Sequence, residues 1–315
     1  MAQTVHTEQA GRVLTVRLDN PPRNFMTGRM VAELDELVRS LDGDRSIGAV
    51  VITGAMDDVF ITHFDVREIV AGVEAVRMGM PPAASGGALR VTGAIRRIPA
   101  AERALRRTPA AGVLALQSIH DLFLRMNASD KVFVAAINGL ALGGGCELAL
   151  ACDVRLMADG EGRIGLPEIT LGILPGAGGT QRLARLLGGG RALEMMLEGR
   201  ALTPREAEAT GLVHRVVAPG ALAEEAAATA QRLARRAPAT VAAIKRAVYE
   251  GGSRPLRQGL HQERAEFLSV SSQPAALRAM RAYVDQVERM GDAAPWQVTE
   301  AMEAWQAGTA VDLTD

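Results

Sequence analysis

The chain has 315 residues, of which 48% are hydrophobic and 3% aromatic, and its formal net charge at pH 7 is -1. This length allows one large domain, or a core domain with a smaller second one, and a sizeable buried core. Because a net charge near zero provides no general attraction to polyanions, composition argues against nucleic acid and acidic membrane surfaces as partners.

The first residues lack the basic and then apolar run of a secretory signal, and no apolar segment is long and uncharged enough to cross a bilayer. We therefore expect a cytoplasmic protein without a membrane partner. The two cysteines, Cys146 and Cys152, fall near or within one predicted helix. We expect reduced, packed thiols there rather than a disulfide or a metal site.

The first part of the chain predicts alternating strands and helices. Residues 13–18 carry apolar side chains at every second position, which predicts a strand, and turn-forming residues follow at 19–22. Thr27 can cap a helix whose apolar residues recur at helical spacing over 30–41, and residues 49–53 are typical of a fully buried strand. This order, which recurs later in the chain, predicts an α/β fold.

A stretch of unusual composition follows at about residues 71–110. Within it, residues 80–87 read Met-Pro-Pro-Ala-Ala-Ser-Gly-Gly, which predicts irregular structure. Six arginines come in close succession: Arg90, Arg96, Arg97, Arg103, Arg106 and Arg107. We expect a solvated insertion; the alternatives are a lid whose arginines bind ligand phosphates or a neighbouring subunit, and nucleic-acid binding, which the lack of interleaved aromatic residues disfavours. A helical pattern resumes over 111–127.

The centre of the chain combines a glycine turn with a carboxylate. The apolar strand 132–137 leads through three consecutive glycines, 143–145, into an apolar helix that carries Glu147. Glycines allow close approach to the backbone, and the first N–H groups of a helix have no partner within it. The turn suits a carbonyl oxygen that gains negative charge, and Glu147 lies near enough to move protons. The alternative is a buried connection whose glycines serve only packing.

A second acidic motif lies at 165–183 and contains Pro167-Glu168-Ile169 and Gly178-Gly179-Thr180-Gln181-Arg182-Leu183. Together with 136–153, it resembles the crotonase superfamily, also called the enoyl-CoA hydratase/isomerase family, which acts on acyl thioesters of coenzyme A. The resemblance covers about 10–70 and 117–290 and is strongest over 132–183. It implies an α/β fold with a crotonase-like core of repeated ββα units over 1–199, interrupted by the insertion, and a C-terminal helical region at 200–290.

By this resemblance, Glu147 and Glu168 are the two catalytic carboxylates. The backbone N–H groups of Phe64 and Gly144 form the oxyanion hole. This sequence departs from the family pattern because His63 and Phe64 replace a small Gly-Ala pair. We expect Phe64 to narrow or reshape the acyl pocket. We expect His63 to be a packed or surface histidine; the alternative is a titrating group that modulates the site.

The resemblance also implies where coenzyme A binds. The residues concerned are Asn24, Met26, Thr62, Asp65, Val66 and Lys245. For Lys245, which lies opposite an apolar helix face formed by Val241, Ile244 and Val248, a solvated surface position is the alternative. No metal or redox cofactor is implied, since coenzyme A arrives with the substrate. Family members commonly form trimers or pairs of trimers, so we expect a homo-oligomer.

The C-terminal region predicts helices and a tail. Thr203 and Pro204 predict a helix start, as N-cap and first helical residue, and Gly211 a helix end. Beyond residue 290 the resemblance stops. In the tail, 291–315, the side chains of Trp296, Met302 and Trp305 predict docking, because exposure of both tryptophans is costly.

The function that follows is reversible hydration of a 2-enoyl-CoA to a 3-hydroxyacyl-CoA. The closest alternative keeps the fold and changes the reaction to double-bond isomerisation, decarboxylation or thioester hydrolysis. A further alternative is a non-catalytic or RNA-binding relative, which the presence of both glutamates disfavours.

Overall fold

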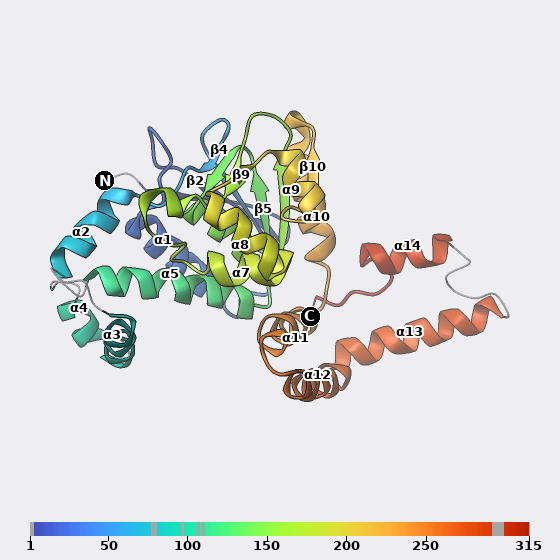
Figure 1. Cartoon of the computed structure of the whole chain (residues 1–315). Helices are drawn as coiled ribbons and strands as arrows, with labels where there is room; N and C mark the ends of the chain where they lie inside the picture. The colour runs from blue at the N-terminus through green and yellow to red at the C-terminus, as the bar shows by residue number, and fades with distance from the viewer. Residues whose placement is uncertain are drawn as a thin grey trace.

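The computed structural model describes residues 3–76, 81–95, 98–105, 108, 111–291 and 299–314. Its sheets lie inside a helix-covered body, from which helices near the C-terminus reach outward (Figure 1). Within the described ranges, no helix combines the length and the apolar character that crossing a membrane requires.

The main sheet has six strands in the order β1-β2-β3-β5-β7-β10. Only β1 runs antiparallel to its neighbour; the other pairs are parallel. Every residue of β3 and β5 is buried, as expected for parallel strands covered on both faces. The strands are β1 (Val5–Ala10), β2 (Val13–Leu18), β3 (Ala49–Gly54), β5 (Val132–Ile137), β7 (Val154–Ala158) and β10 (Arg215–Val217).

A smaller sheet, in the order β4-β6-β8-β9, carries the loops of the site. Each of β4, β6 and β8 follows a strand of the main sheet and leads toward a helix, so the predicted ββα repeat is confirmed. Because β4 and β6 are parallel neighbours, the loops at their carboxyl ends lie side by side. The strands are β4 (Val59–Ile61), β6 (Leu140–Leu142), β8 (Ile164–Gly165) and β9 (Ala201–Leu202).

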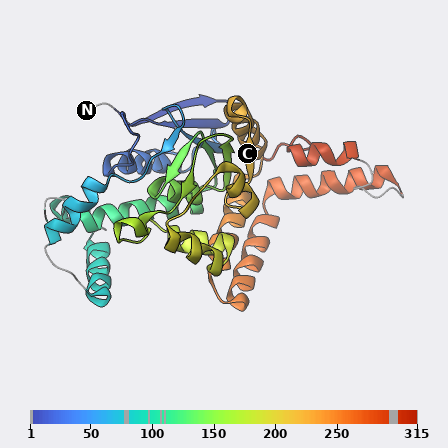
Figure 2. The same ribbon diagram turned by 45° about the horizontal axis from the view of Figure 1, so that its top comes forward.

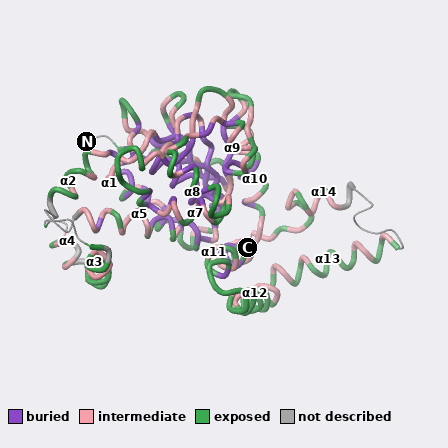
Figure 3. Tube along the Cα trace, viewed as in Figure 1, coloured by how far each residue is buried: buried purple, intermediate pink, exposed green. Residues whose placement is uncertain are grey.

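Two apolar clusters cover the two faces of the main sheet. In β5, Phe133 and Ile137 face the larger cluster, whereas Val134 and Ala136 belong to the cluster that includes α10 residues. This alternation follows from the two-residue period of a strand. The buried residues concentrate in this body (Figure 3). Its helices are α1 (Gly28–Ser40), α5 (Ala111–Ala128), α6 (Gly144–Ala151), α7 (Gly179–Leu187), α8 (Gly189–Glu198), α9 (Pro204–Thr210) and α10 (Leu222–Leu233), with the 3₁₀ turns η1 (Glu168–Leu171) and η2 (Pro219–Ala221).

The insertion contains more helix than the sequence predicts. It leaves along α2 (Val66–Val76), which contacts the start of α5 so closely that a Cβ on Gly112 would lie 3.1 Å from the Cα of Gly72. The prediction of irregular structure over 80–87 is wrong from Pro82 onward, because α3 (Pro82–Ile95) begins there with proline in the first turn, where no N–H is needed. The helix α4 (Pro99–Leu105) follows.

Arg90 lies exposed on α3. Most of the arginine cluster lies outside the described residues: Arg96, Arg97, Arg106, Arg107 and the side chain of Arg103. The lid and nucleic-acid hypotheses for this cluster therefore stay hypotheses.

The C-terminal helices form an arm that extends from the body, which is clearest in Figure 2. Trp305 on α14 makes an edge contact with Tyr283 on α13, with ring centroids 5.6 Å apart, and Arg236, just after α10, donates to the Trp305 carbonyl. The tail is thus docked over 299–314, while Trp296 lies outside the described residues. The elements are α11 (Pro238–Tyr249), η3 (Gly251–Ser253), α12 (Leu256–Ser271), α13 (Pro274–Met290) and α14 (Thr299–Ala307).

Candidate active site

The site is built on the turn between β6 and α6. Gly143 has φ 49°, a left-handed conformation that glycine adopts without strain, and it directs the chain into α6. Every residue of α6 is buried, and its first N–H groups have no partner within the helix. The turn therefore presents backbone donors and the positive end of a helix dipole to the space in front of it.

The first loop brings a second backbone donor to the same place. The Met26 N–H donates to the His63 carbonyl at 2.9 Å, and the Met26 carbonyl accepts from the Asp65 N–H at 2.8 Å. Phe64 lies between these two residues, and its own N–H takes no part in either bond. Among the described residues, neither the Phe64 nor the Gly144 N–H has an acceptor. A Cβ on Gly144 would lie only 3.4 Å from the Phe64 nitrogen. The two predicted oxyanion donors therefore meet.

Glu147 lies in the first turn of α6 and is 3% exposed. Its Oε1 accepts hydrogen bonds from the N–H groups of Ala177 and Gly179, at 2.7 and 2.8 Å. Burial raises the pKa of Glu147 to about 7; the two N–H donors act against that rise, and the charge of Glu168 adds to it. The carboxyl group thus titrates near neutral pH with one oxygen held in place.

Glu168 is the first residue of η1 and faces the same turn. Its Oε1 lies 3.0 Å from the position that a Cβ on Gly143 would occupy. Burial raises the pKa of Glu168, and its Oε2 is buried without a hydrogen-bond partner among the described residues. Glu168 therefore borders Gly143, at the start of the helix that carries Glu147, and the charge of Glu168 makes Glu147 ionise less readily.

His63 also lies against this turn. Its Cβ is 3.7 Å from the would-be Cβ of Gly143, and its ring packs on Phe25 with centroids 4.6 Å apart. Nδ1 is 2.7 Å from the Phe64 carbonyl oxygen, which can only accept, so Nδ1 carries the proton. In the neutral ring, Nε2 is then the acceptor.

The residues expected at coenzyme A mostly build the first loop. Asn24 is fully buried, and its amide donates to the Phe60 carbonyl at 2.8 Å. The Thr62 hydroxyl donates to the carbonyl of Arg23. Met26 is likewise fully buried beneath the loop. The side chains of Asn24, Met26 and Thr62 therefore hold the first loop in shape. The backbone of that loop, rather than these side chains, is the part available to a ligand.

Asp65 and Val66 begin α2. The Asp65 carboxylate forms an ion pair with Arg67, 2.8 Å from Oδ2 to Nη2, and hydrogen bonds from Arg67 lower the pKa of Asp65 against the effect of burial. Val66 is the first helical residue. Both thus lie directly beside the Phe64 donor in the chain.

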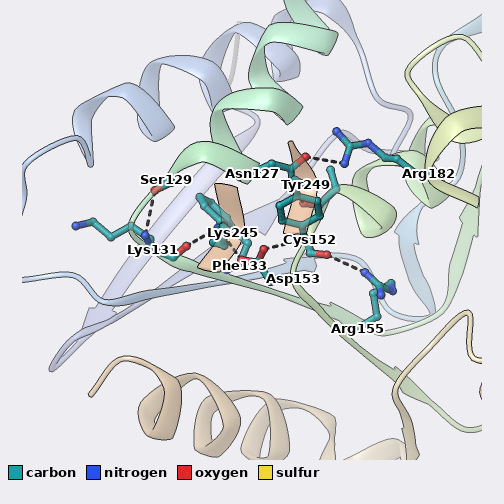
Figure 4. Close-up of polar contacts among 11 residues, drawn as sticks. Asn127, Ser129, Lys131, Phe133, Cys152, Asp153, Arg155, Arg182, Lys245 and Tyr249 are labelled. Atoms are coloured by element: carbon teal, nitrogen blue, oxygen red, sulfur yellow. Dashed lines mark hydrogen bonds and ion pairs between the residues drawn. The ribbon is translucent and has the colours of Figure 1, made fainter. Parts of the chain in front are cut away.

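Lys245 points toward Asp153 and the backbone of Lys131 (Figure 4). It is 6% exposed, and its Nζ donates to Asp153 and to the Lys131 carbonyl at 2.8 and 2.7 Å. The alternative of a solvated surface position is wrong for Lys245, because its side chain faces inward while Ile244 and Val248 are 58% and 62% exposed. Asp153, whose side chain is 15% exposed, supplies the counter-charge for this buried lysine.

The role of Ala177 and Gly179 as donors to Glu147 was missed by sequence reasoning. The signal was present: Gly178 has φ 103° and precedes α7, so this turn also exposes N–H groups at a helix start. A Cβ on Gly179 would lie 2.9 Å from Glu147 Oε1, so only glycine permits that approach. This turn resembles the one at 143–145, since in both a glycine with positive φ directly precedes a helix whose first N–H groups are exposed.

Comparison with known proteins identifies the class of protein to which this chain belongs. The family model described as enoyl-CoA hydratase/isomerase matches residues 102–290. A probable enoyl-CoA hydratase of Rhizobium meliloti is 33% identical over 283 residues, which are 90% of this chain and 95% of that protein. The 2,3-dehydroadipyl-CoA hydratase of Escherichia coli is 35% identical over 257 residues, 81% and 86% of the two chains.

A solved enoyl-CoA hydratase structure from Geobacillus kaustophilus superposes with a TM-score of 0.74 at 26% identity, covering 91% of this chain and 95% of that one. The chain therefore belongs to the enoyl-CoA hydratase/isomerase family, the crotonase superfamily.

Proposed function

We propose that the protein catalyses the reversible hydration of a 2-enoyl-CoA to a 3-hydroxyacyl-CoA. The observation that carries this proposal is that Glu168 lies against Gly143 and its charge acts on the buried Glu147 of α6, next to two backbone N–H groups that have no acceptor among the described residues. Family membership supplies the class of substrate, and the named hydratases among the relatives support the reaction.

The oxyanion donors would act on the thioester carbonyl. Hydrogen bonds from the N–H groups of Phe64 and Gly144 polarise the carbonyl, which makes C3 electrophilic. They also stabilise the enolate-like charge that develops on oxygen after water attacks. Donors fixed in a turn and a helix start need no reorganisation as that charge appears.

The two carboxyl groups divide the proton transfers. Glu147 in its ionised form orients a water molecule and removes its proton as the oxygen bonds to C3. Glu168 in its protonated form gives a proton to C2, so that water is added across the double bond overall. Because Oε1 of Glu147 is occupied by two N–H donors, Oε2 is the oxygen left to accept the proton.

Coenzyme A enters as part of the substrate, and we propose no separate metal or redox cofactor. The nucleotide and pantetheine would lie along the first loop, against the backbone around Asn24, Met26 and Thr62 and the start of α2 at Asp65 and Val66. The burial of Asn24, Met26 and Asp65 supports contact through backbone groups.

The test is a spectrophotometric assay with crotonyl-CoA and a longer 2-enoyl-CoA, with products identified by mass spectrometry. We expect Glu147→Gln and Glu168→Gln each to reduce hydration by about two to four orders of magnitude. Glu161→Gln, at a fully exposed glutamate that pairs with Arg163 only at 3.8 Å, is the matched control and should be unaffected. Near-wild-type hydration by both active-site variants would refute the mechanism.

A second reaction type has one observation in its favour. His63 and Phe64, which replace the small pair of the family pattern, lie against Gly143 and Gly144, and Glu168 borders the same turn. Product masses separate the possibilities. A shifted double bond, loss of CO₂ or release of free coenzyme A would identify isomerisation, decarboxylation or thioester hydrolysis instead of hydration.

We further propose that the protein is a homo-oligomer, a trimer or a pair of trimers. The support is the apolar surface of α12, where Leu256, Phe267 and Leu268 are 78%, 66% and 68% exposed. Exposed apolar side chains gathered on one helix are typical of an interface.

A further inference from the structure

One face of α5 runs alongside residues 176–182, the segment whose backbone N–H groups bond the Glu147 carboxylate. Leu116, His120, Phe123 and Asn127 are spaced by four, three and four residues, so they form one stripe along the helix. All four contact residues between Gly176 and Arg182, and their contacts appear in chain order along the segment.

The far end of the segment is fixed at Arg182. Its Nη1 donates to Asn127 Oδ1 at 2.6 Å, a contact visible in Figure 4, and its guanidinium lies 5.9 Å from the centroid of the Phe123 ring. Asn127 is itself held by a hydrogen bond from its amide to the Ala151 carbonyl at the end of α6. The helix α5 is thus tied both to the segment and to the helix that carries Glu147.

The near end is fixed at Gly176. Nε2 of His120 lies 2.7 Å from the Gly176 carbonyl oxygen, and because a carbonyl oxygen only accepts, Nε2 is the donor. One turn earlier, Leu116 closes the other side, with its Cδ1 3.7 Å from the would-be Cβ of Gly176.

The carbonyl that His120 holds belongs to the same peptide group as the Ala177 N–H. That group is planar, so fixing its oxygen also fixes the direction of its N–H. The Ala177 N–H donates to Glu147 Oε1 at 2.7 Å. Two hydrogen bonds therefore run in series from the imidazole, through one peptide group, to the carboxylate, and such bonds strengthen one another.

We propose that His120 is a positioning residue that holds the Gly176–Ala177 peptide group on Glu147 and favours the ionised carboxylate. The inference rests on the proposed function, in which Glu147 acts in its ionised form. His120 acts through the hydrogen bond that its Nε2–H donates to the Gly176 carbonyl oxygen.

The other groups that face Glu147 are unchanged by a substitution at His120. They are Glu168 from η1, which raises the pKa of Glu147, and Arg182 from α7, which lowers it; the neighbouring thiol of Cys146 is buried and uncharged. A shift in the titration of Glu147 on substitution of His120 is therefore attributable to the peptide group.

The experiment compares His120→Leu with His120→Gln, because the glutamine amide retains a donor at similar reach. We expect His120→Leu to move the acid limb of the pH profile of kcat to higher pH by about one unit. At pH values below the limb, kcat should fall approximately tenfold. KM for crotonyl-CoA should stay the same, and His120→Gln should restore most of the loss. Leu124→Ala, at a position of α5 that is 61% exposed, is the control.

A second readout separates this inference from the proposed function. Carboxyl ¹³C NMR, with Glu147→Gln to assign the signal, follows the titration of Glu147 in protein that need not turn over substrate. An upward shift of that titration in His120→Leu supports the inference even if the reaction proves to be a different one. An unchanged titration, or equal losses in both variants without a shift, would overturn it.

Discussion

At the scale of single residues, Glu147 destabilises the fold in the state in which it would act. Burial raises its pKa from an ordinary 4.5 to about 7, so the ionised form is disfavoured in the folded protein. Between those two values the folded carboxyl group retains a proton that the unfolded chain has released. The free energy of unfolding therefore falls with rising pH across this window, and the full cost applies above it.

This linkage predicts that Glu147→Gln stabilises the protein only at higher pH. Near pH 8 we expect a gain of about 2–3 kcal/mol in the free energy of unfolding, because the amide has no charge to desolvate. Near pH 5 the wild-type carboxyl is already protonated in the fold, so the gain should be close to zero. Urea denaturation at both pH values measures the difference.

The control for that measurement is Glu161→Gln, whose exposed side chain should give no pH-dependent change. An equal gain for Glu147→Gln at both pH values would mean that packing rather than charge causes it.

The site residues that sequence could predict are those encoded by local motifs. Gly143, Gly144 and Glu147 fall within a few positions of one another, so one turn explains them all. His120 could not be found in this way, because its partner Gly176 lies far along the chain and nothing local to α5 signals the contact. Nor did sequence reveal that Lys245 bonds Asp153.

At the scale of elements, the helix boundaries were largely predictable because caps are local. The Thr203 side chain accepts from Glu206 and the Glu206 side chain accepts from Thr203, which completes a capping box, and Gly211 ends α9 in a left-handed conformation, as predicted. The orientation of α11 was not predictable, since Ile244 and Val248 are exposed and Lys245 is buried. Orientation depends on a distant partner, whereas a cap depends on its neighbours.

That orientation predicts that Lys245 stabilises the docking of α11. Lys245→Met leaves the Asp153 carboxylate without its counter-charge, so we expect a loss of about 3–5 kcal/mol in the free energy of unfolding. Adding Asp153→Asn should recover part of that loss, because the uncompensated charge disappears. Urea denaturation of both single variants and the double variant measures the coupling.

The same variant decides between the two roles considered for Lys245. If Lys245→Met weakened binding of crotonyl-CoA without lowering stability, Lys245 would belong to the coenzyme A site after all.

At the scale of the whole molecule, the fold was predictable from its motifs, but its exposed surfaces were not. The ββα core appears where the resemblance is strongest, over 132–183, whereas the helical content of the insertion at 82–95 followed no recognisable motif. Periodicity alone expects apolar faces to turn inward within one chain. It cannot distinguish a face that packs in the same chain from one that meets another copy.

The proposed oligomer predicts that Phe267→Glu shifts the protein toward monomer. A charge placed in an apolar contact loses hydration without gaining a partner, so association should weaken. Sedimentation velocity on the wild-type and variant proteins at equal concentration measures the change, with Glu161→Gln again as control. A wild-type protein that sediments as a monomer would exclude the interface.

The contact between Gly72 and Gly112 has a consequence for how this chain can change over generations. Gly72 on α2 and Gly112 on α5 lie in close contact. The intervening segment, 73–111, therefore begins and ends at neighbouring points of the structure. Lengthening or shortening a segment of this kind adds little closure entropy and leaves both flanking helices where they are. Insertions, deletions or replacements within 73–111 can therefore occur during evolution without moving the turn at Gly143.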